Sequence, residues 1–236
     1  MSGLSGPGQE TVVPLVGLKA MVGDRMMKSL HGSAQLTHHA ECSLEGLLGV
    51  KQLMAEKGTK LSVEDLLIHA VVKTLERHRD LNGTVVDNQI RLRDTVDLSV
   101  AISMPDGSLV APAIFDAGRL PIAERARARK LLVEKANAQK LNFKEMTGGS
   151  FTISNLGLSR VKFFTPILNP PQIAILGVGE TRVVPIIENG GAVIAKPLIG
   201  LSLTFDHRAV NGAPAAAFIS ELCQNIEAMS ESWLLD

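Results

Sequence analysis

The sequence has few of the features that mark specialised classes of protein. Its 236 residues include two cysteines, no tyrosine and one tryptophan, and aromatic residues make up only 3%. Two cysteines cannot form a disulfide framework, and so few aromatics cannot build the stacking surfaces that bind single-stranded nucleic acid. Lysine plus arginine and aspartate plus glutamate balance at 24 each. No basic surplus therefore predicts binding to nucleic acid or to an anionic membrane.

Long apolar runs are missing as well. No stretch approaches the roughly 20 apolar residues that a helix needs to span a bilayer. Residues 1–10 have neither the apolar core of a signal peptide nor the arginine-rich pattern of an organelle presequence. Cys223 falls within a helical pattern, where a small buried apolar side chain is expected. We therefore expect a cytoplasmic protein that binds neither nucleic acid nor a membrane.

The usual motifs for nucleotides and metals are also missing. The Gly-Val-Gly stretch at 177–179 lacks the third glycine and the following helix of a dinucleotide-binding loop. His38 and His39 are adjacent, so on a strand they would point to opposite faces. His69 and His78 have no cysteine partner at metal-binding spacing. We expect surface or core roles for these four histidines and no metal site.

What is present is an ordinary globular composition, with 45% hydrophobic and 20% charged residues. Helical and strand periodicities occur without strict β-α-β alternation. This mixture predicts an α/β fold, a two-layer sandwich in which helices cover one face of a mixed sheet. We expect residues 1–14 to be a flexible arm or the remnant of a linker and residues 15–236 to form one domain. Helices are predicted at 15–30, 44–57, 66–75 (behind a capping box at 62–65), 121–140 and 212–229, and strands at 35–42, 95–104, 109–115, 150–154, 173–179 and 192–205.

The most informative segment is 201–212, where a strand pattern ends at a histidine. Apolar residues alternate as far as Phe205, and His207 follows just before a helix begins. Catalytic side chains tend to lie on loops that a rigid scaffold holds at strand ends. Taken alone, one histidine in such a position is more often structural. The surrounding residues, Phe205-Asp206-His207-x-x-x-Asn211-Gly212, favour the functional interpretation.

This segment resembles the His-x-x-x-Asp-Gly signature of lipoyl acyltransferases and of the related chloramphenicol acetyltransferases. A second block is more specific, because chloramphenicol acetyltransferases lack it. Residues 148–157, GGSFTISNLG, and 164–179, FTPILNPPQIAILGVG, are similar to the central motifs of the lipoyl enzymes. Weaker similarity extends from about Leu15 to the closing residues 233–236. The chain therefore resembles the catalytic domain of the dihydrolipoamide acyltransferase of 2-oxo acid dehydrogenase complexes, with a chloramphenicol acetyltransferase-like fold.

The resemblance implies acyl transfer between a lipoyl thiol and coenzyme A. His207 is then the general base, since a thiol of pKa about 8.5 is mostly protonated at neutral pH. By similarity, Ser154 donates its hydroxyl to the oxyanion that forms; without the family, a strand-end hydroxyl capping a turn is the simpler interpretation. Asn211 stands where the family usually has Asp, and it can accept a hydrogen bond without carrying a charge. Asn211 is also a good N-cap for the last helix, and the two roles are compatible.

Matched to the family, the residues that bind coenzyme A are Lys51, Ser62, Asn155 and Gly179. Structural alternatives are a solvated helix residue for Lys51, an N-cap for Ser62 and a strand terminus for Gly179. The resemblance also implies a homotrimer in which His207 of one chain faces Ser154 of its neighbour. Such trimers often build hollow cubic or dodecahedral cores, and the sequence does not decide whether this chain does so.

Further partners follow from the same resemblance. The lipoyl group would be carried by a separate lipoyl domain, and decarboxylase and dihydrolipoamide dehydrogenase components would act with it. No lipoyl or subunit-binding domain is recognised here, so we expect either a fragment or a chain that uses the lipoyl domain of another protein.

The acyl group and two alternative functions are left open by the sequence. The Ser-Asn-Leu-Gly form resembles acetyl and branched-chain enzymes more than succinyl ones, so acetyl is the first choice, including complexes that act on pyruvate or acetoin. One alternative is a non-catalytic trimeric assembly core, suggested by Asn211 and opposed by the presence of both His207 and Ser154. The other is an acyltransferase with a different acceptor, such as a carrier-protein thiol or a small-molecule hydroxyl.

Overall fold

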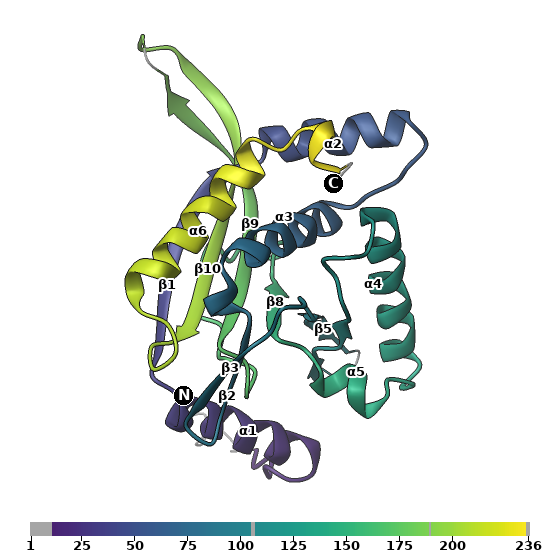
Figure 1. Ribbon diagram of the computed structural model, residues 1–236, viewed down its shortest axis with the longest axis vertical. Helices are drawn as coiled ribbons and strands as arrows, with labels where there is room; N and C mark the ends of the chain where they lie inside the picture. The colour runs from purple at the N-terminus through teal and green to yellow at the C-terminus, as the bar shows by residue number, and fades with distance from the viewer. Residues whose placement is uncertain (1–10, 105–106, 189, 235–236) are drawn as a thin grey trace, which may run out of the picture.

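A mixed six-stranded sheet forms the centre of the molecule (Figure 1). The structure is a computed structural model that describes residues 11–104, 107–188 and 190–234. The strand order is β1-β10-β9-β8-β4-β7; β8 runs parallel to β4 and β9, and the other neighbours are antiparallel. This confirms the predicted mixed sheet. The strands are β1 (Gln35–Ser43), β4 (Leu98–Val100), β7 (Ala113–Ile114), β8 (Phe151–Asn155), β9 (Ala174–Ile187) and β10 (Val193–Asp206).

Helices cover one face of this sheet. The two that lie side by side across it, α3 and α6, are prominent in Figure 1. The ring of Phe218 on α6 lies 5.9 Å from that of Phe151 on β8, and both side chains are fully buried. The two-layer prediction is therefore confirmed. The helices are α1 (Leu18–Gly32), α2 (Glu45–Glu56), α3 (Val63–Arg77), α4 (Ile122–Asn137), α5 (Phe143–Thr147) and α6 (Gly212–Glu227), with short 3-10 turns η1 (Arg79–Leu81) and η2 (Glu231–Leu234).

Several elements differ from the sequence-based expectation. The expected strand pair 95–104 and 109–115 is broken into two pairs, β4 with β7 and β5 (Ile102–Ser103) with β6 (Leu109–Val110). The structure also contains a hairpin of β2 (Gly83–Val86) and β3 (Gln89–Leu92) that was not predicted. Its turn residues, Asp87 and Asn88, adopt positive φ angles of 50° and 57°, which are typical of a tight hairpin turn. The predicted turn residues 105–106 lie outside the described part of the chain.

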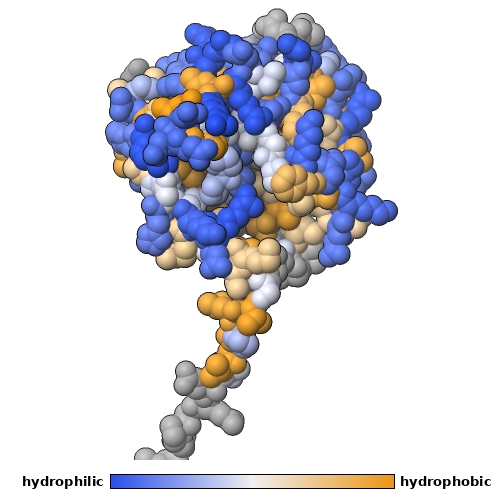
Figure 2. Space-filling view, turned by 60° about the horizontal axis from the view of Figure 1, so that its bottom comes forward, coloured by the Kyte–Doolittle hydropathy of each residue, from blue (hydrophilic) through white to orange (hydrophobic). Residues whose placement is uncertain are grey.

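The N-terminal segment is apolar and exposed. Residues 11–16 have no regular secondary structure, and Val12 and Leu15 are 82% and 78% exposed. Figure 2 shows this segment projecting from the body of the molecule. The first helix begins at Leu18 rather than at Leu15. Residues 1–10 of the predicted arm lie outside the described residues.

Three glycines let a connecting segment cross the sheet closely. A Cβ atom at Gly179 or Gly200 would lie 2.0 or 2.1 Å from the carbonyl oxygen of Lys162, and one at Gly177 would lie 2.8 Å from the ring of Phe164. Segment 161–164 therefore lies directly on β9 and β10. The Gly-Val-Gly stretch is a packing feature, and its glycines are required by this close approach.

Candidate active site

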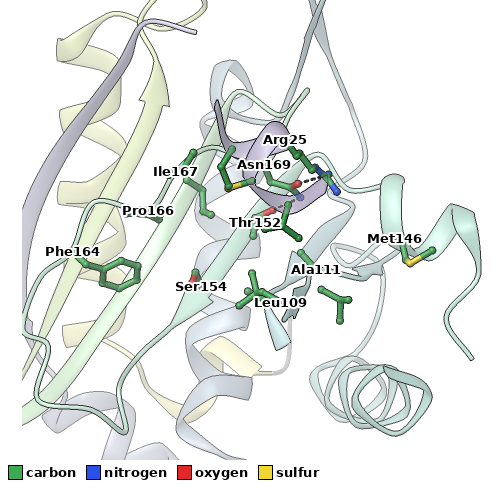
Figure 3. Close-up of a pocket in the computed structure, with 15 residues that line it drawn as sticks. Arg25, Leu109, Ala111, Met146, Thr152, Ser154, Phe164, Pro166, Ile167 and Asn169 are labelled. Atoms are coloured by element: carbon green, nitrogen blue, oxygen red, sulfur yellow. Dashed lines mark hydrogen bonds between the residues drawn. The ribbon is translucent and has the colours of Figure 1, made fainter. Parts of the chain in front are cut away.

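Ser154 lines a cavity of about 340 Å³ on the sheet face that segment 161–164 crosses (Figure 3). It lies on β8, beside Gly177 of β9 in the register of the sheet. Its hydroxyl makes no hydrogen bond to any described residue. A half-buried hydroxyl that is not engaged by the protein can donate to a group bound in the cavity.

The period of two along β8 directs the serine into this cavity. Phe151 and Ile153 point into the core beneath the helices, where both are buried. Thr152 and Ser154 point the other way and line the cavity. Asn155 points back toward α3, where its amide nitrogen donates to Glu64 over 3.4 Å.

The walls of the cavity are mainly apolar, with one polar side. Arg25 of α1 donates to the Asn169 side chain over 2.7 Å, and the Asn169 amide reaches Thr152 Oγ1 at 3.4 Å (Figure 3). Phe164 lies on the opposite side and projects into the same space as Ser154. The cavity is therefore suited to a largely apolar ligand with a polar group near the serine. The lining residues are Val22, Arg25, Met26, Ala101, Leu109, Val110, Ala111, Met146, Thr152, Ser154, Phe164, Pro166, Ile167, Asn169 and Ile175.

His207 lies at the end of β10, where hydrogen bonds hold its backbone. Its amide nitrogen donates to the Ala34 carbonyl over 2.8 Å. The buried Asp206 carboxylate accepts bonds from the backbone amide of Ala34 and from the Arg208 guanidinium, the closest at 2.6 Å. Burial alone would raise the pKa of Asp206, but these hydrogen bonds hold it below its ordinary value. The imidazole of His207 is exposed, on a turn that its neighbours fix in place.

Within one chain, Ser154 and His207 are too far apart to act together. Ser154 is level with Gly177 and Ser202, and His207 follows five residues beyond Ser202. At about 3.3 Å per residue and about 4.8 Å between strands, their Cα atoms lie roughly 19 Å apart. Groups that act on one reacting carbon must both lie within a few ångströms of it. A site that uses both residues therefore needs two protomers.

Asn211 occupies the backbone position of an N-cap without acting as one through its side chain. Its φ and ψ angles of −80° and 162° are those of an N-cap before α6. The side chain makes no capping hydrogen bond, so the predicted side-chain cap is wrong. The exposed Asn211 side chain follows His207 by four residues, on the same short connection between β10 and α6.

Three of the four coenzyme A candidates lie in one neighbourhood. Ser62 is the N-cap of α3, with the predicted capping box to Asp65. Its hydroxyl donates to the Asp65 carboxylate over 2.6 Å, and Glu64, two residues along, links to Asn155. The turn after Asn155 lies against Gly179, since a Cβ atom at Gly157 would be 3.3 Å from the Gly179 carbonyl oxygen. No described contact ties the fourth candidate, Lys51 of α2, to this group.

The four histidines for which the sequence predicted surface or core roles make contacts within the fold. His38 and His39 point to opposite faces of β1, as predicted: His38 packs against Phe205, and His39 bonds Ser202 and packs against Phe163. The other two bond within the fold, His69 to Arg125 and the Trp233 carbonyl and His78 to Glu221. Among the described residues, no group of three potential ligands is placed to hold a metal ion.

The two cysteines lie together, which the sequence did not indicate. Cys42 of β1 and Cys223 of α6 are neighbours, and the thiol of Cys223 together with burial raises the pKa of Cys42. Cys223 is half-buried and packs against the core, close to its predicted role.

No described helix combines the length and hydropathy that a membrane crossing requires.

Comparisons with known proteins agree with this architecture. The model for the 2-oxoacid dehydrogenases acyltransferase catalytic domain matches residues 7–234. The dihydrolipoyllysine-residue acetyltransferase component of the acetoin cleaving system of Bacillus subtilis is 37% identical over 91% of this chain and 55% of that protein. The succinyltransferase component of the 2-oxoglutarate dehydrogenase complex of Haemophilus influenzae is 32% identical over 92% and 54%. The chain thus spans about half the length of these relatives.

Solved structures give the same answer. The dihydrolipoamide acetyltransferase of Azotobacter vinelandii is similar with a TM-score of 0.85 and 30% identity, over 93% of this chain and 92% of that one. The work on that enzyme concerns the catalytic role of a serine, a histidine and an asparagine four residues after the histidine. The cubic core of a pyruvate dehydrogenase multienzyme complex is equally similar. A chloramphenicol acetyltransferase shares the fold at 15% identity and a TM-score of 0.55. This chain belongs to the family of 2-oxoacid dehydrogenase acyltransferase catalytic domains.

Proposed function

We propose that the protein transfers an acyl group between coenzyme A and a dihydrolipoyl thiol. The observation that carries this proposal is the unengaged Ser154 hydroxyl in a mainly apolar cavity, where a thioester would fit. His207 and Asn211 are four residues apart, which is the spacing of the histidine and asparagine studied in the Azotobacter enzyme. An asparagine at this position, where the family usually has aspartate, therefore also occurs in at least one relative.

In this mechanism His207 removes the proton from the attacking thiol, and the thiolate adds to the thioester carbonyl. The hydroxyl of Ser154 donates to the resulting oxyanion. Collapse of the tetrahedral species breaks the original carbon–sulfur bond, and the protonated His207 returns the proton to the departing thiolate. The Asn211 amide, four residues after His207 and free of a capping bond, helps to orient the substrate thiol or the imidazole. No covalent acyl-enzyme is needed.

The proposed assembly is a homotrimer with a site at each subunit boundary. Its support is the roughly 19 Å between Ser154 and His207 within one chain, together with exposed apolar side chains on the N-terminal segment and α1. Such side chains are typical of surfaces that another subunit covers. Val12 and Leu15 are examples, and Met21 is 68% exposed. Larger cubic or dodecahedral cores are a further proposal, which the similarity to a cubic core supports.

Lys51, Ser62, Asn155 and Gly179 remain the proposed coenzyme A residues, and three of them share one neighbourhood. The lipoyl group would arrive on a separate lipoyl domain, with decarboxylase and dihydrolipoamide dehydrogenase components as further partners. The coenzyme A residues and the partner proteins rest on the resemblance to the family, and the names of the relatives as components of multienzyme systems support the partners. The bacterial sources of these relatives support a cytoplasmic location.

The direct test is acyl transfer from acetyl-CoA to free dihydrolipoamide, followed as release of coenzyme A. We expect saturable transfer, with dihydrolipoamide far better than a small-molecule alcohol or a carrier-protein thiol. No transfer by an assembled trimer would instead support a non-catalytic core. If another acceptor were preferred, the protein would still be an acyltransferase, but dihydrolipoamide would not be its acceptor.

Phe164 predicts a small acyl group. Its ring lies over Gly177, the register neighbour of Ser154, and therefore restricts the cavity beside the reacting carbonyl. We expect Phe164→Ala to raise kcat/KM for isobutyryl-CoA relative to acetyl-CoA by about tenfold or more, since space for one or two methyl groups is worth about 1–3 kcal/mol. Steady-state kinetics with both thioesters measures this ratio.

A matched control is Met146→Ala, which removes a large apolar side chain from the far side of the same cavity. This variant should leave the ratio within about twofold of wild type. An unchanged ratio in Phe164→Ala, or an equal change in both variants, would show that Phe164 does not limit the acyl group.

A further inference from the structure

One arginine on α4 connects three residues at the start of α3. Arg129 Nε donates to Asp65 over 2.7 Å, Nη1 donates to Glu64 over 2.8 Å and Nη2 reaches Ser62 Oγ at 3.3 Å. The Arg129 side chain is only 13% exposed, and that of Asp65 is 1% exposed. A planar guanidinium with several donors can hold this arrangement, whereas the single ammonium of a lysine cannot.

The contacts continue to the strand that carries Ser154. Glu64 binds Arg129 through Oε2 and accepts from Asn155 Nδ2 through Oε1 at 3.4 Å. The Asn155 Oδ1 in turn accepts from the amide of Gly157 over 2.8 Å, which fixes the turn after β8. Arg129 is thus connected through Glu64 to Asn155, the residue next to Ser154.

The negative charges at the start of α3 are unfavourable for a phosphorylated substrate. Glu64 and Asp65 place two carboxylates in the first turn of α3, and Arg129 is the cation that binds both. Burial alone would raise the pKa of Asp65, but hydrogen bonds from Arg129 and Ser62 lower it overall, so the carboxylate remains ionised at neutral pH. The three groups together carry a charge of −1, and without Arg129 they would carry −2.

The hydroxyl of Ser62 is already engaged. It donates to Asp65 Oδ2 over 2.6 Å and accepts from the Asp65 amide at 3.1 Å and from Arg129. Its hydrogen is therefore committed to the capping box. The Asp65 amide and Arg129 occupy the two acceptor lone pairs of this hydroxyl, so the position of Ser62 depends on Asp65 and Arg129.

We propose that Arg129 is a positioning residue for coenzyme A, holding Ser62 and Asn155 in place and offsetting the two carboxylates beside the substrate phosphates. This inference rests on the proposed function, in that it takes Ser62 and Asn155 as the coenzyme A side of the site. It assigns Arg129 an electrostatic role in substrate binding in addition to its role in packing α4 against α3.

The test is a KM comparison between the two substrates. In Arg129→Gln, we expect the KM for acetyl-CoA to rise about tenfold and the KM for dihydrolipoamide to stay within about twofold, since of these two substrates only acetyl-CoA carries phosphates that one additional nearby charge repels. The effect should shrink as salt is added from 0.05 to about 0.5 M, because salt screens partly exposed charges. A purely structural role would not give this selectivity or this salt dependence.

Three further variants keep the test decisive if Arg129→Gln folds poorly. Arg129→Lys retains the charge but not the three-partner geometry, so it should recover the salt-dependent part of the lost affinity for acetyl-CoA and leave the rest. Glu64→Gln removes one of the two carboxylates and should lower the KM for acetyl-CoA, and Glu64→Gln combined with Arg129→Gln should lie closer to wild type than Arg129→Gln does. The matched control is Arg77→Gln, which breaks the ion pair with Glu221 at the other end of α3 and should leave both KM values unchanged.

Calorimetric binding of coenzyme A to the assembled protein separates this inference from the proposed function. If wild type binds coenzyme A without transferring an acyl group to dihydrolipoamide, the proposed function fails, and the Kd values of the same variants still test Arg129. Equal changes in both KM values, or a double variant as weak as Arg129→Gln alone, would overturn the role given to Arg129.

Discussion

Replacing His207 by alanine is expected to lower kcat by about 10²- to 10⁴-fold, the usual contribution of a positioned general base. The side chain is exposed, so its removal leaves the core intact, and the turn is held by the backbone amide and by Asp206. The KM for acetyl-CoA should change little because the imidazole acts on the proton of the attacking thiol rather than on the thioester substrate. Steady-state acyl transfer to dihydrolipoamide at pH 7 measures both parameters.

The control is His31→Ala, which removes another exposed imidazole, from the last turn of α1. That variant should keep wild-type kcat. Full activity in His207→Ala would contradict the assignment of the general base. Unfolding midpoints of the two variants should match that of wild type, so that a loss of activity can be attributed to chemistry.

Replacing Ser154 by alanine is expected to lower kcat by about 10²- to 10³-fold, the usual cost of one lost oxyanion donor. The hydroxyl makes no bond to a described residue, so its loss leaves no unpaired partner in the fold. Since the donor acts on charge that develops only in the transition state, kcat should fall and KM should not rise. Rapid-mixing or steady-state measurement of coenzyme A release gives the change.

Ser159→Ala is the matched control, because Ser159 lies in the following turn and bonds only the Leu156 carbonyl and the Val161 amide among the described residues. It should retain the wild-type rate. If Ser154→Ala raised KM with an unchanged kcat, Ser154 would be a ground-state contact and the oxyanion role would be wrong.

The short motifs around Ser62 and Ser154 predicted the local structure best, because each depends only on residues that are close together in the sequence. The strand carrying Ser154 has a period of two, so the alternation Phe-Thr-Ile-Ser is sufficient to place the serine opposite the core. The capping box at Ser62 was equally local, and it formed as predicted. The strand predicted at 173–179 is too short, because Glu180–Arg182 and Pro185 interrupt the apolar run although β9 continues to Ile187.

Long-range contacts could not be predicted in this way. Arg129 and Glu64 lie 65 positions apart, and nothing in a helix rich in arginine distinguishes the one that binds α3. Phe164 occupies a connection without regular structure, and its place over Gly177 follows from how that connection crosses the sheet. The one sequence feature that pointed to this crossing was the pair of glycines at 177 and 179. Such a pair indicates that another segment of chain approaches the strand closely.

The central claim is that each active site takes His207 from one protomer and Ser154 from another. The most direct measurement mixes the two inactive variants, His207→Ala and Ser154→Ala, by unfolding them together and refolding them into common trimers. In an equal random mixture, about half of the histidine positions and half of the serine positions are intact, so roughly a quarter of the sites contain both. We predict that activity recovers to about one quarter of wild type. Activity that stays at the level of the separate variants would contradict a site shared between protomers.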